Sequence, residues 1–99
     1  MFKNRMRAVH PGEIIREEFM IPMGLSANAL AKALHVPTPR INDVIRGRRG
    51  VSADTAMRLA RYFGGDARSW LNLRAAYDLQ ITQLAVGERI EREVTPAAA

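Results

Sequence analysis

Residues 26–47 read SANALAKALHVPTPRINDVIRG, a pattern typical of two short amphipathic helices joined by a tight turn. Ser26 is a favourable N-cap, and Leu30 and Leu34 lie on one face of the helix that follows it. This helix is expected to end before Pro37, because the residue preceding a proline is pushed out of the α region.

The second helix of the pair is expected to begin at Thr38 and Pro39 and to end at Gly47, which can adopt the left-handed conformation that follows many helices. Ile41 and Val44 face back toward the preceding helix. Two helices joined in this way allow one to lie in the major groove of DNA while the other braces against the backbone. The segment therefore predicts a helix-turn-helix.

Three further helices are expected around this pair, and no segment has a convincing strand pattern. Their expected limits are Pro11 to Gly24, Ser52 to Gly64 and Asp66 to Gly87, where the glycine is expected to interrupt the last helix. Trp70, on the last helix, is expected in the core. The expected fold is all-α with five helices, divided into an N-terminal extension (residues 1–9), a helix-turn-helix domain (10–86) and a charged, frayed C-terminal tail (87–99).

The length and composition indicate one soluble domain. A chain of 99 residues can bury one hydrophobic core and not two. Hydrophobic residues make up 47% of the chain and aromatic residues 6%, which is typical of an aliphatic core. No apolar run is long enough to span a membrane, and the sequence HPGE at 10–13 stands where a signal peptide would need its apolar stretch. With no cysteine present, we expect a cytoplasmic protein.

The positive charge is concentrated in the first half of the chain. Residues 1–50 carry nine Lys or Arg against four Asp or Glu, whereas residues 51–99 carry six of each. The densest cluster lies in residues 40–49, which hold four arginines and one aspartate. Such an excess favours a polyanionic partner, although a solvated basic loop would give the same pattern.

The side chains left on the outer side of the second helix of the pair are suited to reading DNA. They are Thr38, Arg40, Asn42, Asp43 and Arg46. Arginine pairs with guanine, asparagine with adenine and aspartate with the cytosine amino group, while threonine contacts a methyl group or a phosphate. The sequence therefore predicts a sequence-specific DNA-binding protein.

Motifs along most of the chain carry a resemblance to a known family. They are HPGEIIREEF (10–19), GLS (24–26), RIN (40–42), GRRGVSADT (47–55), RLARYFG (58–64) and WLNL (70–73). Over residues 9–84 the chain resembles the HigA antitoxins, single-domain members of the lambda-repressor-like Xre/Cro/C1 class. The resemblance implies a homodimer that binds a palindromic operator and represses its own operon. It also implies that the chain neutralises HigB, a RelE-like toxin that cleaves messenger RNA.

The resemblance further implies which residues contact DNA. The groove-reading positions fall on Thr38, Pro39, Arg40, Asn42 and Asp43, and the backbone contacts fall on Ser26, Asn28, Arg46, Arg48 and Arg49. Two positions depart from the family's pattern. His35 stands where glycine is usual, so either a residue with a Cβ has a positive φ or the turn differs. Ala27 replaces a glutamine that often braces the reading helix, which would put more weight on phosphates and DNA shape.

Two surfaces are candidates for protein partners. Glu13 and Glu17 lie one turn apart on the first helix and are expected to leave an acidic face outward, which would attract a basic RNA-cleaving toxin. We therefore take them as candidate toxin-binding residues. Leu71, Leu79 and Leu84, on the last helix, are candidates for a second apolar partner surface.

Two other functions fit the same sequence. One is a stand-alone or phage-type repressor without a toxin, and the other is a protein-interaction module that does not bind DNA, which the arginine cluster disfavours. We expect no enzymatic activity, cofactor or metal site, because His10 and His35 lie far apart and fit no ligand spacing or nucleophile arrangement.

Overall fold

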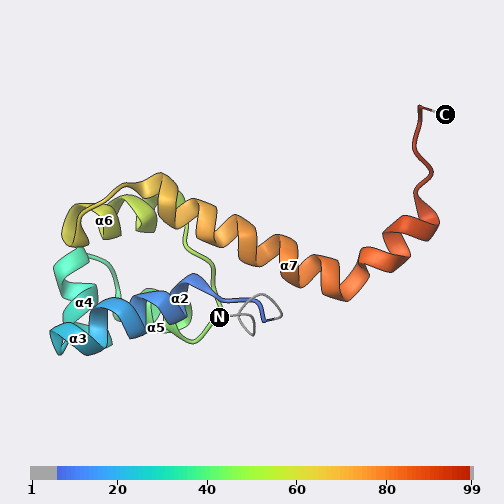
Figure 1. The fold of residues 1–99 in the computed structure, drawn as a ribbon. Coiled ribbons are helices and arrows are strands. Elements are labelled where there is room, and N and C mark those ends of the chain that lie inside the picture. Colours follow the sequence, from blue (N-terminus) through green and yellow to red (C-terminus); the bar gives the residue numbers. More distant parts are fainter. Residues whose placement is uncertain (1–6, 99) are drawn as a thin grey trace.

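Helices make up almost all the regular structure in residues 7–98, the part of the chain that this computed structural model describes (Figure 1). The first helix is continuous and consists of α2 (Pro11–Ile14), the π-helical segment η1 (Ile15–Met20) and α3 (Ile21–Met23). The others are α4 (Ala27–Leu34), α5 (Thr38–Ile45), α6 (Ala53–Phe63) and α7 (Ala67–Glu93). No strand occurs within the described residues, so the predicted all-α, five-helix fold is confirmed.

The π-helical turn is explained by a proline near the end of the first helix. Pro22 has no N–H, and in an α-helix its ring would clash with the carbonyl four residues earlier. The helix widens before this point, so that the N–H of Ile21 bonds to the carbonyl of Arg16, five residues back. It then continues through Pro22 and ends at Gly24, which has φ 66° and takes the left-handed conformation.

The N-cap predicted at Ser26 is confirmed, and Ser52 and Asp66, the predicted starts of two later helices, also act as N-caps. Ser26, Ser52 and Asp66 each accept a hydrogen bond from the backbone N–H three residues later, at 3.0, 3.2 and 2.8 Å. The first helix has a less usual cap, in which Nδ1 of His10 accepts a hydrogen bond of 2.9 Å from the N–H of Gly12. These side chains fix where four of the five helices begin.

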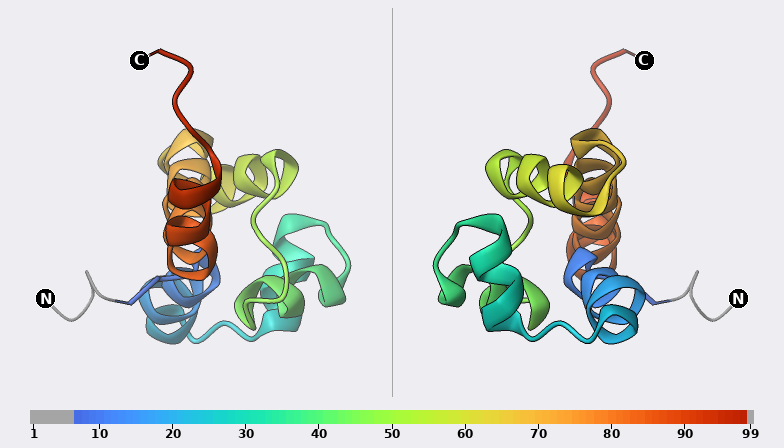
Figure 2. Two further views of the ribbon diagram at one scale, coloured as in Figure 1. Left: turned by 90° about the vertical axis from the view of Figure 1, so that its right-hand side faces the viewer. Right: turned by 90° about the vertical axis from the view of Figure 1, so that its left-hand side faces the viewer.

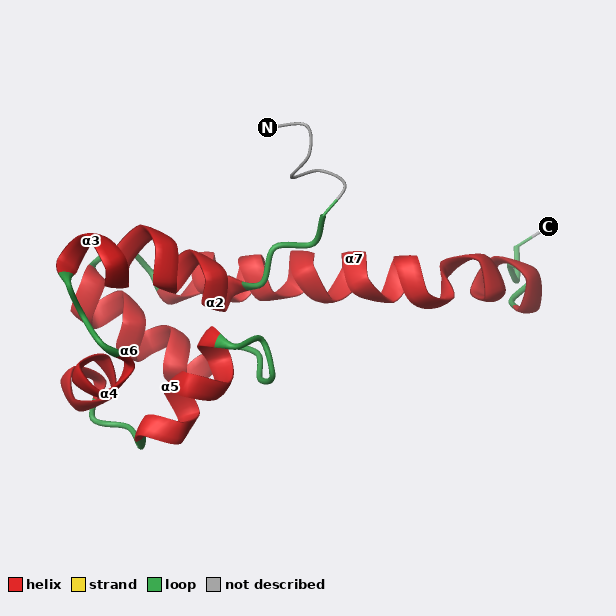
Figure 3. Cartoon of the chain, turned by 90° about the horizontal axis from the view of Figure 1, so that it is seen from below, coloured by secondary structure: helices red, strands yellow, loops and turns green. Residues whose placement is uncertain are grey.

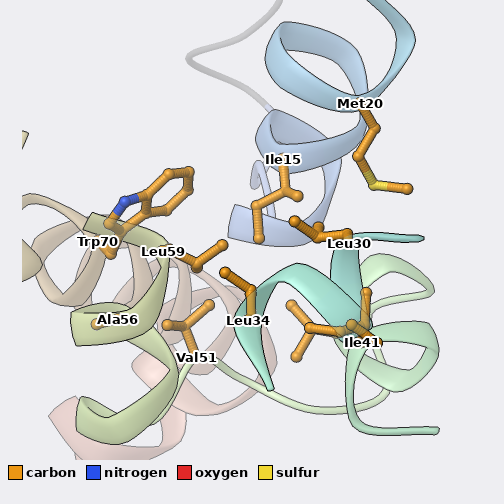
Figure 4. Close-up of a cluster of buried hydrophobic side chains, with 11 residues drawn as sticks. Ile15, Met20, Leu30, Leu34, Ile41, Val51, Ala56, Leu59 and Trp70 are labelled. Carbon is orange, nitrogen blue, oxygen red and sulfur yellow. The ribbon is translucent and has the colours of Figure 1, made fainter. Parts of the chain in front are cut away.

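The core lies between the first four helices and the start of α7. Its eleven buried apolar side chains, drawn in Figure 4, are Ile15, Met20, Leu30, Ala31, Leu34, Ile41, Val44, Val51, Ala56, Leu59 and Trp70. The Trp70 ring is 6% exposed, which confirms its predicted core position. Phe19 packs beside it, with its ring centroid 4.4 Å from that of Phe63 and 5.8 Å from that of Trp70. The core therefore fixes the start of α7 against the helix-turn-helix.

The last helix extends far beyond this core. α7 is 27 residues long, and its second half projects away from the other helices (Figures 1 and 3). The predicted interruption at Gly87 is wrong, because one glycine costs a helix only about 1 kcal/mol and good helix formers follow it. Residues 87–93 of the predicted tail thus belong to α7, and residues 94–98 lie outside any helix.

The predicted N-terminal extension, residues 1–9, falls mostly outside the described residues. Arg7 is described and forms an ion pair of 2.9 Å with Glu13 of α2. Among residues 7–98, no helix combines the length and the apolar character needed to cross a membrane.

Candidate DNA-binding surface

α4 and α5 form the predicted helix-turn-helix, and Figure 2 shows this pair to one side of the long axis of α7. The turn between them depends on His35, which has φ 59° and ψ 47°. The sequence left open whether His35 has a positive φ or the turn differs from the family's, and the structure shows the positive φ. A residue with a Cβ adopts the left-handed conformation here, at a cost of about 1–2 kcal/mol.

The back of α5 is held by an unusually close approach of the first helix. A Cβ added to Gly12 would lie 1.9 Å from the carbonyl oxygen of Val44, which is backbone and cannot move aside. Only glycine fits there, so Gly12 sets the distance between α2 and α5. The sequence reasoning placed Gly12 in a motif but assigned it no role, although a Pro-Gly pair at a helix start was the available signal.

The predicted residues at the N-terminal ends of α4 and α5 lie together. Thr38 Oγ1 donates a hydrogen bond of 2.9 Å to Asn28 Oδ1, which links the two helices. Ser26 is occupied as the N-cap of α4. Pro39 is exposed beside this pair, and Asn42 is half-buried one turn later on α5.

Arg40 does not extend freely from α5. Its Nη1 lies 2.9 Å from Oδ1 of Asp54 at the start of α6, and the same oxygen lies 2.7 Å from Nε of Arg58. Arg58 Nη1 in turn donates to the carbonyl of Leu34 at 2.9 Å, at the end of α4. The hydrogen bonds from Arg58 and Arg40 lower the pKa of the Asp54 carboxyl. Arg40 can therefore reach a base only by leaving Asp54.

The sequence reasoning missed Asp54 and Arg58 as part of this surface. The four-residue spacing of the two side chains was a signal for an ion pair. The contact of Arg40 with α6 had no such local signal.

The loop after α5 presents the other predicted basic residues. Asp43 receives hydrogen bonds at its carbonyl from the N–H groups of Arg48 and Arg49, at 2.8 and 3.2 Å, and its carboxylate lies 3.1 Å from Nη2 of Arg48. Arg46 and Arg49 are exposed and take part in none of the ion pairs found among residues 7–98. The loop is therefore held by its own hydrogen bonds and leaves the guanidinium groups of Arg46 and Arg49 without an ion pair among the described residues.

α7 holds the far end of this loop. Arg74 Nη1 donates a hydrogen bond of 3.0 Å to the carbonyl of Val51. A Cβ added to Gly50 would lie 2.9 Å from Arg74 Nε, so the arginine crosses directly over the loop backbone. The helix that projects from the core is thus connected to the loop that carries Arg48 and Arg49.

The predicted acidic face of the first helix is partly paired. Glu13 lies 2.9 Å from Arg7, and the hydrogen bond from this arginine is the main reason that the pKa of Glu13 is lowered. Glu17 lies 2.9 Å from Arg16. Glu18 is exposed beside them. The carboxylates predicted to attract a basic partner therefore each have a cationic neighbour.

The predicted apolar partner surface on α7 is reduced by one residue. Leu71 packs against the core and is half-buried, so its assignment to a partner surface is wrong. Leu79 and Leu84 are each 71% exposed, as expected. Ile90 extends the exposed apolar surface along the projecting half of α7, and Val94, just after the end of the helix, is also exposed.

Comparisons with known proteins place this geometry in a family. Residues 15–70 match the family model described as Helix-turn-helix. "Virulence-associated protein I" of Dichelobacter nodosus is 65% identical over 82% of this chain and 75% of that protein, and "Antitoxin HigA-1" of Vibrio cholerae is 38% identical over 84% of this chain and 78% of that protein.

A match to a solved structure covers nearly the whole length of both chains. The Pseudomonas aeruginosa antitoxin HigA with the higBA promoter has a TM-score of 0.88 and 47% identity, over 92% of this chain and 99% of that chain. The chain therefore belongs to the helix-turn-helix family and, within it, to the group that includes the HigA antitoxins.

Proposed function

We propose that the chain is an antitoxin that represses its own operon by binding a palindromic operator and neutralises a RelE-like, mRNA-cleaving toxin. The observation that carries this proposal is the near-complete match, at 47% identity, to a HigA solved with its promoter. The α4–α5 pair with the basic loop behind it is the surface that would enter the major groove. The protein would act in the cytoplasm, as a regulator and not an enzyme.

Within this function the residues divide into two groups. Thr38, Pro39, Arg40, Asn42 and Asp43 would read base edges. Ser26, Asn28, Arg46, Arg48 and Arg49 would contact the DNA backbone. The division is supported by position, since the first group lies on α5, whereas the second lies at the start of α4 and directly after α5. Phosphate contacts of the second kind fix register and orientation, while base contacts supply specificity.

A homodimer would present two reading helices to a palindrome. The projecting half of α7 is the surface best suited to a second copy, because Leu79, Leu84 and Ile90 are exposed there within residues 7–98. The expected operator is an inverted repeat whose half-site centres are about 34–36 Å apart, or a multiple of that spacing.

Two measurements test this function. The chain is co-expressed with the product of the adjacent gene, and a stable complex with a basic, RelE-like partner supports the antitoxin role. Footprinting on the DNA upstream of the chain's own gene tests repression, and protection of a single unpaired half-site would contradict it. Operator binding with no adjacent toxin gene would instead support the stand-alone repressor.

Glu13 and Glu17 remain our proposal for part of the toxin surface. The Glu13→Lys, Glu17→Lys double variant should weaken the complex with the toxin and make it less sensitive to salt, because charge complementarity chiefly raises the association rate. Helical content and operator binding should stay near normal. Glu88→Lys with Glu91→Lys, at the exposed end of α7, is the matched control; equal loss of toxin affinity in both double variants would remove the assignment.

A further inference from the structure

His10 contacts three parts of the fold at once. Its Nδ1 caps α2 by accepting from the N–H of Gly12 at 2.9 Å. Its ring and that of Tyr77 on α7 form an edge-to-face pair, with the centroids 4.8 Å apart and the planes at 77°. A Cβ placed on Gly47 would lie 3.9 Å from two atoms of the ring, so the imidazole also lies against the loop after α5.

The hydrogen bonds of His10 require a neutral ring with its proton on Nε2. Nδ1 can accept from Gly12 only when it carries no proton, which leaves the other nitrogen as a donor. The backbone of Arg49 is close enough to the ring to act on it as a hydrogen-bonding neighbour, which raises the pKa of His10. His10 therefore ties the residue predicted to contact phosphate to the start of the first helix.

Protonation would remove the cap and add an unfavourable charge. An imidazolium has no acceptor for the N–H of Gly12, and it would stand at the positive end of a helix dipole. Burial lowers the pKa of His10 from its usual value of 6.5, although the hydrogen bond with Arg49 and the charge of Asp78 oppose this shift.

The polar groups near this site come from all three elements. α2 contributes Glu13, which is already paired with Arg7, and the loop contributes the backbone of Arg49. α7 contributes Asp78, whose carboxylate lies 3.5 Å from Nε of Arg74. Asp78 is the acid that would favour an imidazolium, and its own arginine partner weakens that effect.

We propose that His10 is a positioning residue for DNA binding: its neutral imidazole links the start of α2 to the loop of Arg48 and Arg49, and protonation breaks this link at the Gly12 bond and weakens binding. The inference rests on the proposed operator binding. It is distinct from any base or phosphate contact by His10 itself, because the ring acts through the loop backbone.

The test measures affinity for two duplexes between pH 7.5 and 5.5 at constant ionic strength. One duplex carries the DNA upstream of the chain's own gene, and the other is a random sequence of equal length. The wild-type affinity should fall about 3- to 10-fold for both, since protonation removes the Gly12 bond that anchors the ring, and with it the link that positions the phosphate contacts. His10→Asn should bind at pH 7.5 about as weakly as the wild type at pH 5.5 and should change little with pH.

Asparagine is the matched replacement because it remains a good N-cap and does not titrate. Circular dichroism should show that the helical content of the variant is retained. His35→Asn is the control for the other histidine, since asparagine tolerates the left-handed conformation, and it should keep the wild-type fall in affinity. NMR of the wild type adds a measurement without a variant: the amides of Gly47 and Arg49 should titrate with the His10 ring.

Three results would overturn the inference. These are a wild-type affinity that is constant or rises as the pH falls, a His10→Asn variant that keeps the wild-type pH profile, and loop amides that do not follow the ring. If the wild type binds the upstream duplex no better than the random one at pH 7.5, the proposed operator binding fails instead.

Discussion

Two residues determine where the recognition helix lies and how its arginine is held. Gly12 allows the backbone of α2 to reach α5, since a side chain there would meet the carbonyl of Val44 at 1.9 Å. Asp54, which belongs to α6, holds Arg40 at 2.9 Å. Both contacts are made with residues outside the α4–α5 pair, so the geometry of the reading helix depends on neighbours at a distance in the chain.

Gly12→Ala should destabilise the protein by about 3 kcal/mol, because the added methyl group overlaps backbone that cannot move aside. Gly24→Ala is the matched control. No atom lies within 4 Å of a Cβ at Gly24, and only its φ of 66° opposes the substitution. Its expected cost is about 1 kcal/mol. Urea unfolding of both variants checks this, and equal losses would show that the α2–α5 contact is not crowded.

Arg40→Ala and Arg48→Ala should have different effects on the affinity for operator DNA and for random DNA. Loss of a bidentate base contact by Arg40 should cost about 1–3 kcal/mol on the operator and little on random DNA. Loss of Arg48 should weaken binding to both duplexes equally. It should also reduce the slope of log affinity against log salt concentration by about one. Arg89→Ala, at the exposed end of α7, is the control. Equal weakening of both duplexes by Arg40→Ala would make Arg40 a phosphate contact.

At the level of elements, α7 combines two roles. Its first half packs Trp70 into the core and binds the loop through Arg74 and, indirectly, through Tyr77 and His10. Its second half has no partner within the described chain and exposes apolar side chains. Because α7 is continuous from Ala67 to Glu93, it joins its exposed end to the part of the helix that binds the loop of Arg48 and Arg49.

Gly87→Ala should stabilise the projecting half of α7 by about 1 kcal/mol, because alanine loses less backbone entropy in a helix. The new Cβ would meet the Gln83 side chain at 3.4 Å, an ordinary contact. Hydrogen exchange of the amides in residues 84–92 measures the effect. Slower exchange is expected there, with unchanged rates in α4 and α5, and unaltered exchange throughout would contradict the prediction.

At the level of the whole molecule, shape indicates how the chain assembles. The chain measures 53 × 27 × 24 Å, and the long dimension follows the projecting helix. One copy offers only one reading helix, whereas a palindrome needs two. A second copy on the projecting half of α7 would bury its apolar side chains and supply the second reader.

Leu79→Asp with Leu84→Asp should dissociate the proposed dimer and leave the core intact, because both side chains are 71% exposed in the single chain. Light scattering should show a monomer with unchanged helical content. Operator affinity should fall steeply, since each monomer then binds its half-site alone. Ala75→Asp, at an exposed position nearer the core, is the control. A double variant that stays dimeric would place the interface elsewhere.

Much of this protein can be predicted from local sequence. Ser26, Ser52 and Asp66 cap helices because their side chains bond to N–H groups three residues away, and the glycines that end helices adopt a positive φ on their own. The apolar periodicity that identifies Ile41, Val44 and Trp70 as core is also a property of single helices. These signals were sufficient for the five helices and the helix-turn-helix.

The features decided by tertiary structure all involve residues far apart in the chain. The pairing of Arg40 with Asp54, the contact of Gly12 with Val44, and the position of His10 between the loop and α7 exist only once the helices are packed. α7 continues through Gly87 because the cost of one glycine in a helix, about 1 kcal/mol, is too small by itself to end the helix. Local patterns thus determined the elements, while packing determined which side chains reach the DNA-binding surface and what holds them there.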